Sequence, residues 1–192
     1  MTLGEIAEFK YGYTDSAKNN GSARFIRITD ISENGKLLPN DCKYVDLLNE
    51  NKNYLLEIGD LLMARTGATY GKTMLFGIHE TAVFASFLIR IRFPEKIILP
   101  MYYWHFAQSK LYWNQVNKLV SKAGQPQFNA NVLKKVVIPT PSINEQEHIV
   151  RLLDRFDSLT TDIITGLPTE IATRQNQYEY YRDKLLTFKG IA

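Results

Sequence analysis

The sequence predicts an α+β fold, with a sheet-rich domain of residues 1–141 followed by a long helical region of residues 142–192. In the first hundred residues, the apolar runs are short and separated by turn residues, which is typical of strands. From residue 142 onward, apolar residues recur every three or four positions, which is typical of a helix with one apolar stripe. The content of 45% hydrophobic and 12% aromatic residues is that of a folded globular protein.

Short strands are expected over most of the first domain. Residues Phe25–Ile31 alternate apolar and polar side chains, and Asn34–Gly35 has the composition of a turn. Three later apolar runs have the length and composition of strands, at residues 61–65, 74–78 and 82–93. Residues 10–14 are predicted to form a turn near the start of the chain.

The hydrophobic period changes after Pro100. Residues 101–119 are predicted to form one helix with a heavily aromatic face. A polar loop at 125–131, a single helical turn at 132–135 and a last strand at 136–138 complete the first domain. The domain therefore mixes a sheet with a few helices.

The helical region has a marked start and a marked interruption. Ser142 and Glu145 have the spacing of a capping box at a helix start. A kink or break is expected at residues 166–168, because Pro168 removes a backbone donor. About 46 helical residues would extend roughly 70 Å if they were collinear. The spacing leaves open whether the two arms are collinear, as in a coiled coil, or fold back as a hairpin.

The apolar stripe of this helical region is a predicted interface. In a second copy of the chain the same stripe would be available for coiled-coil pairing, whereas a hairpin would bury part of the stripe within one chain. The predicted interface residues are Leu152, Phe156, Leu159, Ile163, Leu167, Ile171, Tyr178, Tyr181 and Leu185.

Charge and composition exclude several classes of protein. Residues 1–141 carry 17 Lys and Arg against 12 Asp and Glu, a balance of +5, and residues 142–192 carry 6 against 8, a balance of −2. This mild basic excess agrees with a nucleic-acid partner but is weak evidence for one. Because Cys42 is the only cysteine, an internal disulfide is excluded. The sequence contains no apolar run long enough for a membrane span and no apolar leader, so we expect a cytoplasmic protein.

No catalytic or metal site is predicted. The three histidines, His79, His105 and His148, have no spacing typical of metal ligands. The segment Gly67–Thr73 is similar to a phosphate-binding loop, but it has three residues where that motif requires four. The chain is therefore expected to be a binding protein.

An ordered set of motifs resembles the specificity subunits of type I restriction-modification systems. Each motif alone is weak, but together they span nearly the whole chain. The motifs are Leu3–Ile6, Phe25–Ile31, Gly59–Leu62, Arg65–Gly67, Gly71–Lys72, Gln125–Gln127, Ile138–Pro141, Glu145–Gln146, Ile149–Val150 and Gln177–Leu186.

This resemblance implies a non-catalytic role. Residues 1–141 would be a target-recognition domain that binds double-stranded DNA, and residues 142–192 would be a conserved spacer and dimerisation region. Partner subunits would supply the chemistry: modification subunits would methylate adenine with S-adenosylmethionine, and restriction subunits would use ATP and Mg²⁺. Members of this family usually carry two recognition domains, whereas this chain has one. It would therefore read one half of a bipartite site, as a homodimer or together with another specificity half.

Two polar loops of the first domain carry the residue types that contact DNA. Arg, Lys, Asn and Gln present donors to base edges or phosphates, and hydroxyl groups bind phosphates. The predicted DNA-binding residues are Arg65, Thr69, Tyr70, Lys72, Lys122, Gln125, Gln127 and Asn129. The alternative function is a helical scaffold or adaptor whose globular domain binds another protein.

Overall fold

The computed structural model describes residues 1–94, 97–120, 128–157 and 177. The chain divides into two compact units, Met1–Val150 and Arg151–Ala192. The first unit contains both sheets and all of the labelled helices. The α+β fold class predicted for the first domain is confirmed.

The larger sheet has four strands, β1 (Glu8–Tyr11), β4 (Leu61–Ala64), β5 (Thr73–Leu75) and β7 (Leu88–Arg92). Their order is β1-β7-β4-β5, and all neighbours are antiparallel.

The smaller sheet has the order β3-β2-β6 and is mixed. Strand β2 (Ala23–Ile26) pairs antiparallel with β3 (Tyr44–Val45) and parallel with β6 (Ala82–Phe84). Every residue of β2 and β6 is buried, as expected for strands covered on both faces.

Four labelled α-helices and three short 3-10 helices lie among the described residues of the first unit. The α-helices are α1 (Leu3–Ile6), α2 (Pro100–Gln108), α3 (Lys110–Leu119) and α4 (Ala130–Leu133). The 3-10 helices are η1 (Ile28–Asp30), η2 (Lys52–Tyr54) and η3 (Gly67–Thr69).

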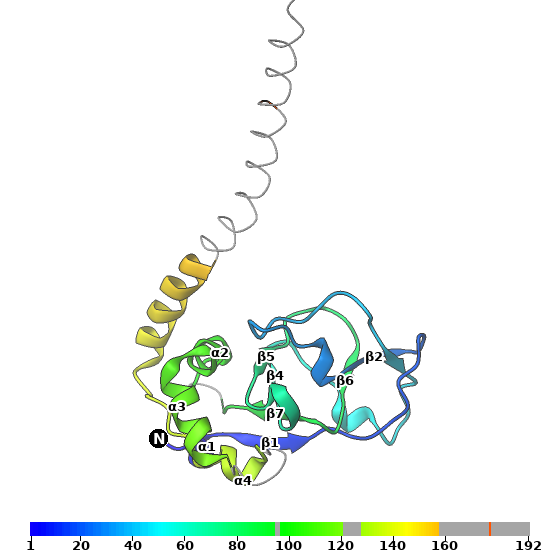
Figure 1. The fold of residues 1–192 in the computed structure, drawn as a ribbon, viewed down its shortest axis with the longest axis horizontal. Coiled ribbons are helices and arrows are strands. Elements are labelled where there is room, and N and C mark those ends of the chain that lie inside the picture. The colour runs from blue at the N-terminus through cyan, green and yellow to red at the C-terminus, as the bar shows by residue number, and fades with distance from the viewer. Residues whose placement is uncertain (95–96, 121–127, 158–176, 178–192) are drawn as a thin grey trace, which may run out of the picture. The chain divides into compact units, whose positions relative to one another are not determined.

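The four-stranded sheet separates two hydrophobic cores. Met63 and Ile91 project from one face into a core shared with residues of the helices, such as Tyr103. Leu62 and Leu88, on the opposite face, pack in a core shared with the smaller sheet. Figure 1 shows the helices on one side of β4 and β7 and the strands β2 and β6 on the other. Alternation of side chains along each strand produces this layering.

Several predicted elements differ from the observed ones, and of the strand expected at 136–138 only Val137 pairs, in an isolated bridge with Thr2. The single helix expected at 101–119 is two helices, because the Ser109 hydroxyl group accepts a hydrogen bond from Tyr112 N at 3.2 Å and caps α3. The strand expected at 82–93 is divided into β6 and β7 by a turn at residues 86–87. The turn expected at 10–14 was wrong at its start, since Lys10 and Tyr11 pair with β7.

The strand predicted at Phe25–Ile31 ends at Ile26 and is followed by η1. The Asp30 carboxylate accepts a hydrogen bond from Arg27 N at 2.8 Å and from the Arg27 guanidinium at 2.7 Å. This local bonding favours the 3-10 turn over continued pairing.

The predicted helix start after Pro141 is confirmed. Residues 143–157 are helical, and the Ser142 hydroxyl group accepts a hydrogen bond from Glu145 N at 3.4 Å. Gln146 is fully buried and binds Leu99 N and Ile97 O, each at 2.9 Å. The first turns of this helix are therefore tied to the first unit.

The rest of the predicted helical region, including the break at 166–168, lies outside the described residues. None of the helices in the described part of the chain is long and apolar enough to cross a bilayer. Among the same residues, no group of three or more His, Cys, Asp or Glu side chains has the arrangement of a metal site.

Candidate nucleic-acid interface

The segment between β4 and β5 forms a closed loop that carries four of the predicted DNA-binding residues. Its ends are held together by hydrogen bonds from Ala64 N to Lys72 O at 2.9 Å and from Gly71 N to Ala64 O at 2.8 Å. Gly71 has a φ of +81°, and a Cβ atom there would lie 3.2 Å from the Trp113 ring. Glycine is favoured here, because other side chains rarely adopt this φ and a Cβ atom would crowd the ring.

Arg65, at the start of this loop, is fixed by both its backbone and its side chain. Its N–H group donates to Phe87 O at 3.0 Å, and its carbonyl accepts from Phe128 N at 2.8 Å. The side-chain Nε donates to Ser86 O at 2.9 Å. These bonds connect three separate parts of the chain, residue 65, residues 86–87 and residue 128, and the Nε bond holds the guanidinium against Ser86.

Two exposed aromatic rings flank the Arg65 guanidinium. Its central carbon lies 5.5 Å from the Tyr11 ring centroid and 5.6 Å from the Phe87 ring centroid. Tyr11 is 42% exposed and Phe87 is 50% exposed, whereas Arg65 is half-buried. The Tyr11 hydroxyl group accepts a hydrogen bond from Ala130 N at 3.0 Å, which fixes that ring in turn. The sequence did not predict either Tyr11 or Phe87 as a residue of the site.

Tyr70 and Lys72 contact other parts of the domain. The Tyr70 hydroxyl group donates to Asn117 Oδ1 at 3.3 Å, and its ring meets Trp113 edge-on. Lys72 Nζ lies 2.5 Å from Glu33 Oε1. The structure therefore places these two side chains against α3 and Glu33, and not beside the Arg65 group.

The side-chain oxygen atoms of Thr69 and Asn129 are buried or already bonded within the domain. Thr69 Oγ1 is buried and has no hydrogen-bond partner among the described residues. Asn129 Oδ1 accepts a hydrogen bond from Val132 N at 3.1 Å and caps α4, which leaves only its amide N–H groups for a ligand. Lys122, Gln125 and Gln127 lie outside the described residues.

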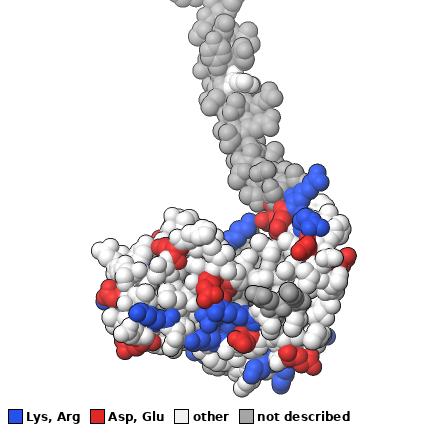
Figure 2. Space-filling view, turned by 180° about the vertical axis from the view of Figure 1, so that it is seen from behind, with Lys and Arg blue, Asp and Glu red and all other residues white. Residues whose placement is uncertain are grey.

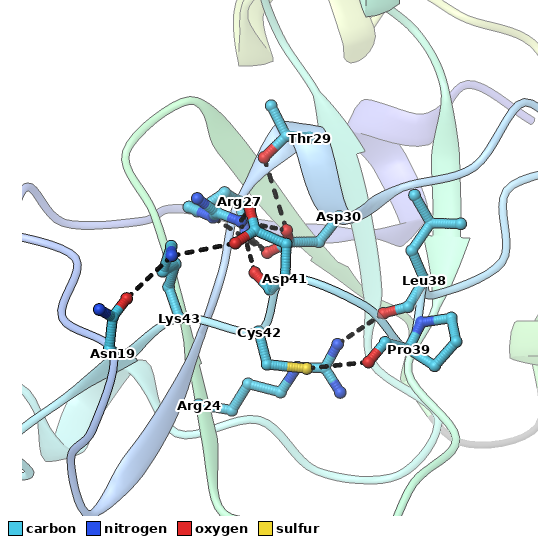
Figure 3. Close-up of polar contacts among 10 residues, drawn as sticks. All are labelled: Asn19, Arg24, Arg27, Thr29, Asp30, Leu38, Pro39, Asp41, Cys42 and Lys43. Carbon is cyan, nitrogen blue, oxygen red and sulfur yellow. Dashed lines mark hydrogen bonds and ion pairs between the residues drawn. The ribbon is translucent and has the colours of Figure 1, made fainter.

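A second basic group, in the loop before β3, is neutralised internally (Figure 3). Arg27 lies 2.7 Å from Asp30 and 3.2 Å from Asp41, and Lys43 lies 2.9 Å from Asp41. Lys43 first, and Arg27 second, lower the pKa of the Asp41 carboxyl group. The two cations of this cluster are thus engaged with two carboxylates.

A third basic group surrounds the buried carboxylate of Asp60. Arg92 donates to Asp60, with Nη2 2.8 Å from Oδ2, and Arg90 Nη1 lies 3.8 Å from the same Oδ2 atom. Lys10 faces Arg90 across the β1–β7 pair. Partial burial lowers the pKa of the Lys10 ammonium group, and the neighbouring charges of Arg90 and Arg92 lower it further.

Arg65 differs from the other arginines of the first unit, because it has no acidic partner among the described residues. Residues 1–150 contain five arginines, and the described ion pairs join four of them to carboxylates. These four are Arg24, Arg27, Arg90 and Arg92. Figure 2 shows basic and acidic side chains next to each other on one face of the molecule. Among the described arginines of the first unit, an arginine without a carboxylate partner is therefore a distinctive feature.

Comparison with known proteins identifies the class to which this domain belongs. Residues 1–173 match the type I restriction modification DNA specificity domain, so the chain belongs to that family. The family membership that the motifs predicted is confirmed.

Particular relatives are specificity subunits. The chain is 30% identical to the type I restriction enzyme EcoR124I/EcoR124II specificity subunit of Escherichia coli, over 97% of this chain and 48% of the relative. It is 28% identical to the EcoprrI specificity subunit of the same species, over 98% of this chain and 50% of the relative. The chain thus spans about half the length of these curated relatives.

Solved structures share the fold. The HsdS subunit from Thermoanaerobacter tengcongensis aligns with a TM-score of 0.63 at 18% identity, over 97% of this chain and 46% of that chain. A structure of a type I restriction-modification assembly aligns with a TM-score of 0.66 at 18% identity, over 95% of this chain and 42% of the matched chain. Both likenesses support the α+β architecture described above.

Proposed function

We propose that this chain is a non-catalytic DNA-specificity subunit that reads one half of a bipartite site. The observation that carries the proposal is the family match, which extends from residue 1 to residue 173 and so includes much of the predicted helical region. The relatives are about twice as long. One recognition domain in place of two would read one half-site.

The helical region would pair this chain with a second copy or with another specificity half. Leu152 is 46% exposed and Phe156 is 66% exposed in the single chain, and both belong to the predicted apolar stripe. The other seven residues of that stripe lie outside the described residues, so their part in the interface is a prediction. A collinear helix of roughly 70 Å would match about 20 base pairs and would set the spacing between half-sites.

Partner subunits would carry out the reaction in the cytoplasm. Modification subunits would dock on this chain and methylate adenine with S-adenosylmethionine, and restriction subunits would consume ATP with Mg²⁺. The task of this chain would be to bind double-stranded DNA at a chosen sequence and to position those subunits on it.

Selection from a pool of random DNA duplexes tests this proposal. The purified chain, in complex with the modification subunit encoded beside it, is incubated with the pool, and bound duplexes are sequenced. We expect enrichment of a bipartite sequence with a fixed gap. Recovery of an unenriched pool by a folded, associated complex would contradict DNA reading and favour an adaptor role.

A further inference from the structure

Arg65 and its two flanking rings combine a fixed cation with exposed apolar surface. The guanidinium has no carboxylate partner, and Nη1 and Nη2 form no hydrogen bond among the described residues. A positive charge close to two exposed rings and without a carboxylate among the described residues is suited to an anionic ligand. The planar fork of Nη1 and Nη2 matches two oxygens of one phosphate group.

The attachment of Nε determines how far this fork can reach. Because Nε donates to Ser86 O, the side chain cannot extend away from the surface without breaking that bond. Tyr11 and Phe87 are also more exposed than Arg65. A side chain that reads bases must enter a major groove about 8.5 Å deep. The position of Arg65 instead suits a phosphate at the outer surface of the duplex.

The two rings suit the sugars beside that phosphate. Tyr11 and Phe87 provide exposed apolar surface close to the guanidinium. The Tyr11 ring is held at its hydroxyl end by the hydrogen bond from Ala130 N, and the backbone of Phe87 is held by the hydrogen bond from Arg65 N to Phe87 O. Aromatic side chains held in place at low entropic cost make effective contacts.

We propose that Arg65, Tyr11 and Phe87 form a backbone anchor, in which the guanidinium binds one DNA phosphate and the rings pack against the adjoining deoxyriboses. This inference rests on the proposed function, because it assigns a role within the same DNA-binding surface. It makes Arg65 a positioning contact that acts equally on all sequences.

The test compares the salt dependence of DNA binding between variants. The full chain in complex with its modification subunit is titrated with a labelled duplex of mixed sequence between 50 and 200 mM salt. For Arg65→Gln, we expect roughly a tenfold loss of affinity and a reduction of about 1 in the slope of log K against log salt.

Three further variants separate the effect of the Arg65 charge on DNA binding from the effect of the shapes of the guanidinium and the ring. Arg65→Lys should keep the salt slope but bind more weakly than wild type, because an ammonium group lacks the planar fork. Phe87→Ala should lose affinity about threefold to tenfold with no change in slope, since it removes no charge. Lys18→Gln removes one positive charge from an exposed ion pair with Asp46 and should leave both quantities unchanged.

The outcomes distinguish this inference from the function on which it rests. If the wild-type complex binds DNA and folded Arg65→Gln binds with the same affinity and slope, the anchor is wrong and the proposed function stands. If Arg65→Gln changes the preferred base at one position of the selected sequence, Arg65 reads a base and the anchor is again overturned. If the wild-type complex does not bind DNA at all, the proposed function fails.

Discussion

At the scale of single residues, the partners of each charged side chain decide what it can do. In the sequence, nothing distinguishes Arg65 from the other arginines. In the structure, a carboxylate pairs with each of Arg27, Arg90 and Arg92. Within the part of the chain that the structure describes, the Arg65 guanidinium contacts a carbonyl group and two rings but no carboxylate. Net charge alone could not separate these cases, because the difference lies in contacts between residues far apart in the chain.

Asp41 links stability to pH. Lys43 and Arg27 lower the pKa of this carboxyl group in the folded state. Its stabilising contribution is therefore present above the ordinary Asp pKa of about 3.9 and is lost as the pH falls through the lower folded value. Asp41→Asn should be less stable than wild type at pH 7, and the difference should shrink below about pH 4.

Urea denaturation at pH 7 and pH 3 measures this effect. Asn is a suitable replacement because it tolerates the φ of +53° found at position 41. Glu50→Gln is the control, since Glu50 is exposed and forms no ion pair among the described residues. A stability difference for Asp41→Asn that stays constant across this pH range would contradict the assigned ion pairs.

Among the predicted DNA-binding residues that the structure describes, Thr69 has the surroundings that fit the prediction least. Its hydroxyl group is buried and unpaired among the described residues, so it would reach a phosphate only if the loop opened. Thr69→Val should leave DNA affinity unchanged and leave stability equal or raised by up to about 1 kcal/mol. Thermal unfolding and duplex titration measure the two quantities. A clear loss of DNA affinity would restore Thr69 as a contact.

At the scale of elements, Gln146 holds the start of the helix at residues 143–157 against the chain before α2. Its side chain forms three hydrogen bonds, to Leu99 N, Ile97 O and Pro141 O, each at 2.9 Å. Gln146→Ala would leave these groups without partners and should cost about 2 kcal/mol in the free energy of unfolding.

Chemical denaturation of Gln146→Ala measures that cost. Asn144→Ala, at an exposed position in the same turn, should change stability by less than about 0.5 kcal/mol. Equal effects of the two substitutions would mean that the Gln146 bonds do not hold the helix start.

The sequence predicted elements whose signals are local. Strand β4 was found because its apolar run is short and follows a turn at Gly59, and the helix start was found from Ser142 and Glu145. The break at Ser109 was missed because aromatic residues continue at helical spacing on both sides of it. Local capping overrode that periodicity.

The candidate site was only partly predictable for a related reason. Arg65, the one residue of the proposed anchor that was predicted, was chosen from residue type and loop composition. Tyr11 and Phe87 were missed because nothing in their own segments marks them. Only the pairing of β1 with β7, and of Arg65 N with Phe87 O, brings the rings to the guanidinium.

At the scale of the whole molecule, pairing through the helical region is the step that would turn one half-site reader into a reader of a bipartite site. Leu152→Ser should raise the monomer fraction by removing apolar area from the predicted stripe. Leu153→Ser is the matched control, because Leu153 is 39% exposed on the same helix but does not belong to that stripe.

Sedimentation velocity of the full chain measures this shift in association. Both substitutions lie at exposed positions, so the first unit should stay folded in each. If Leu152→Ser and Leu153→Ser associate as strongly as wild type, the predicted stripe is not the interface.

The most direct test of the central claim is the methylome of a host that expresses this chain with its neighbouring modification subunit and no other specificity gene. Single-molecule sequencing should reveal a new adenine-methylated motif that is bipartite, palindromic if two copies pair and asymmetric if another half completes the site. The absence of any new motif, with both proteins present and associated, would contradict the claim that this chain reads DNA.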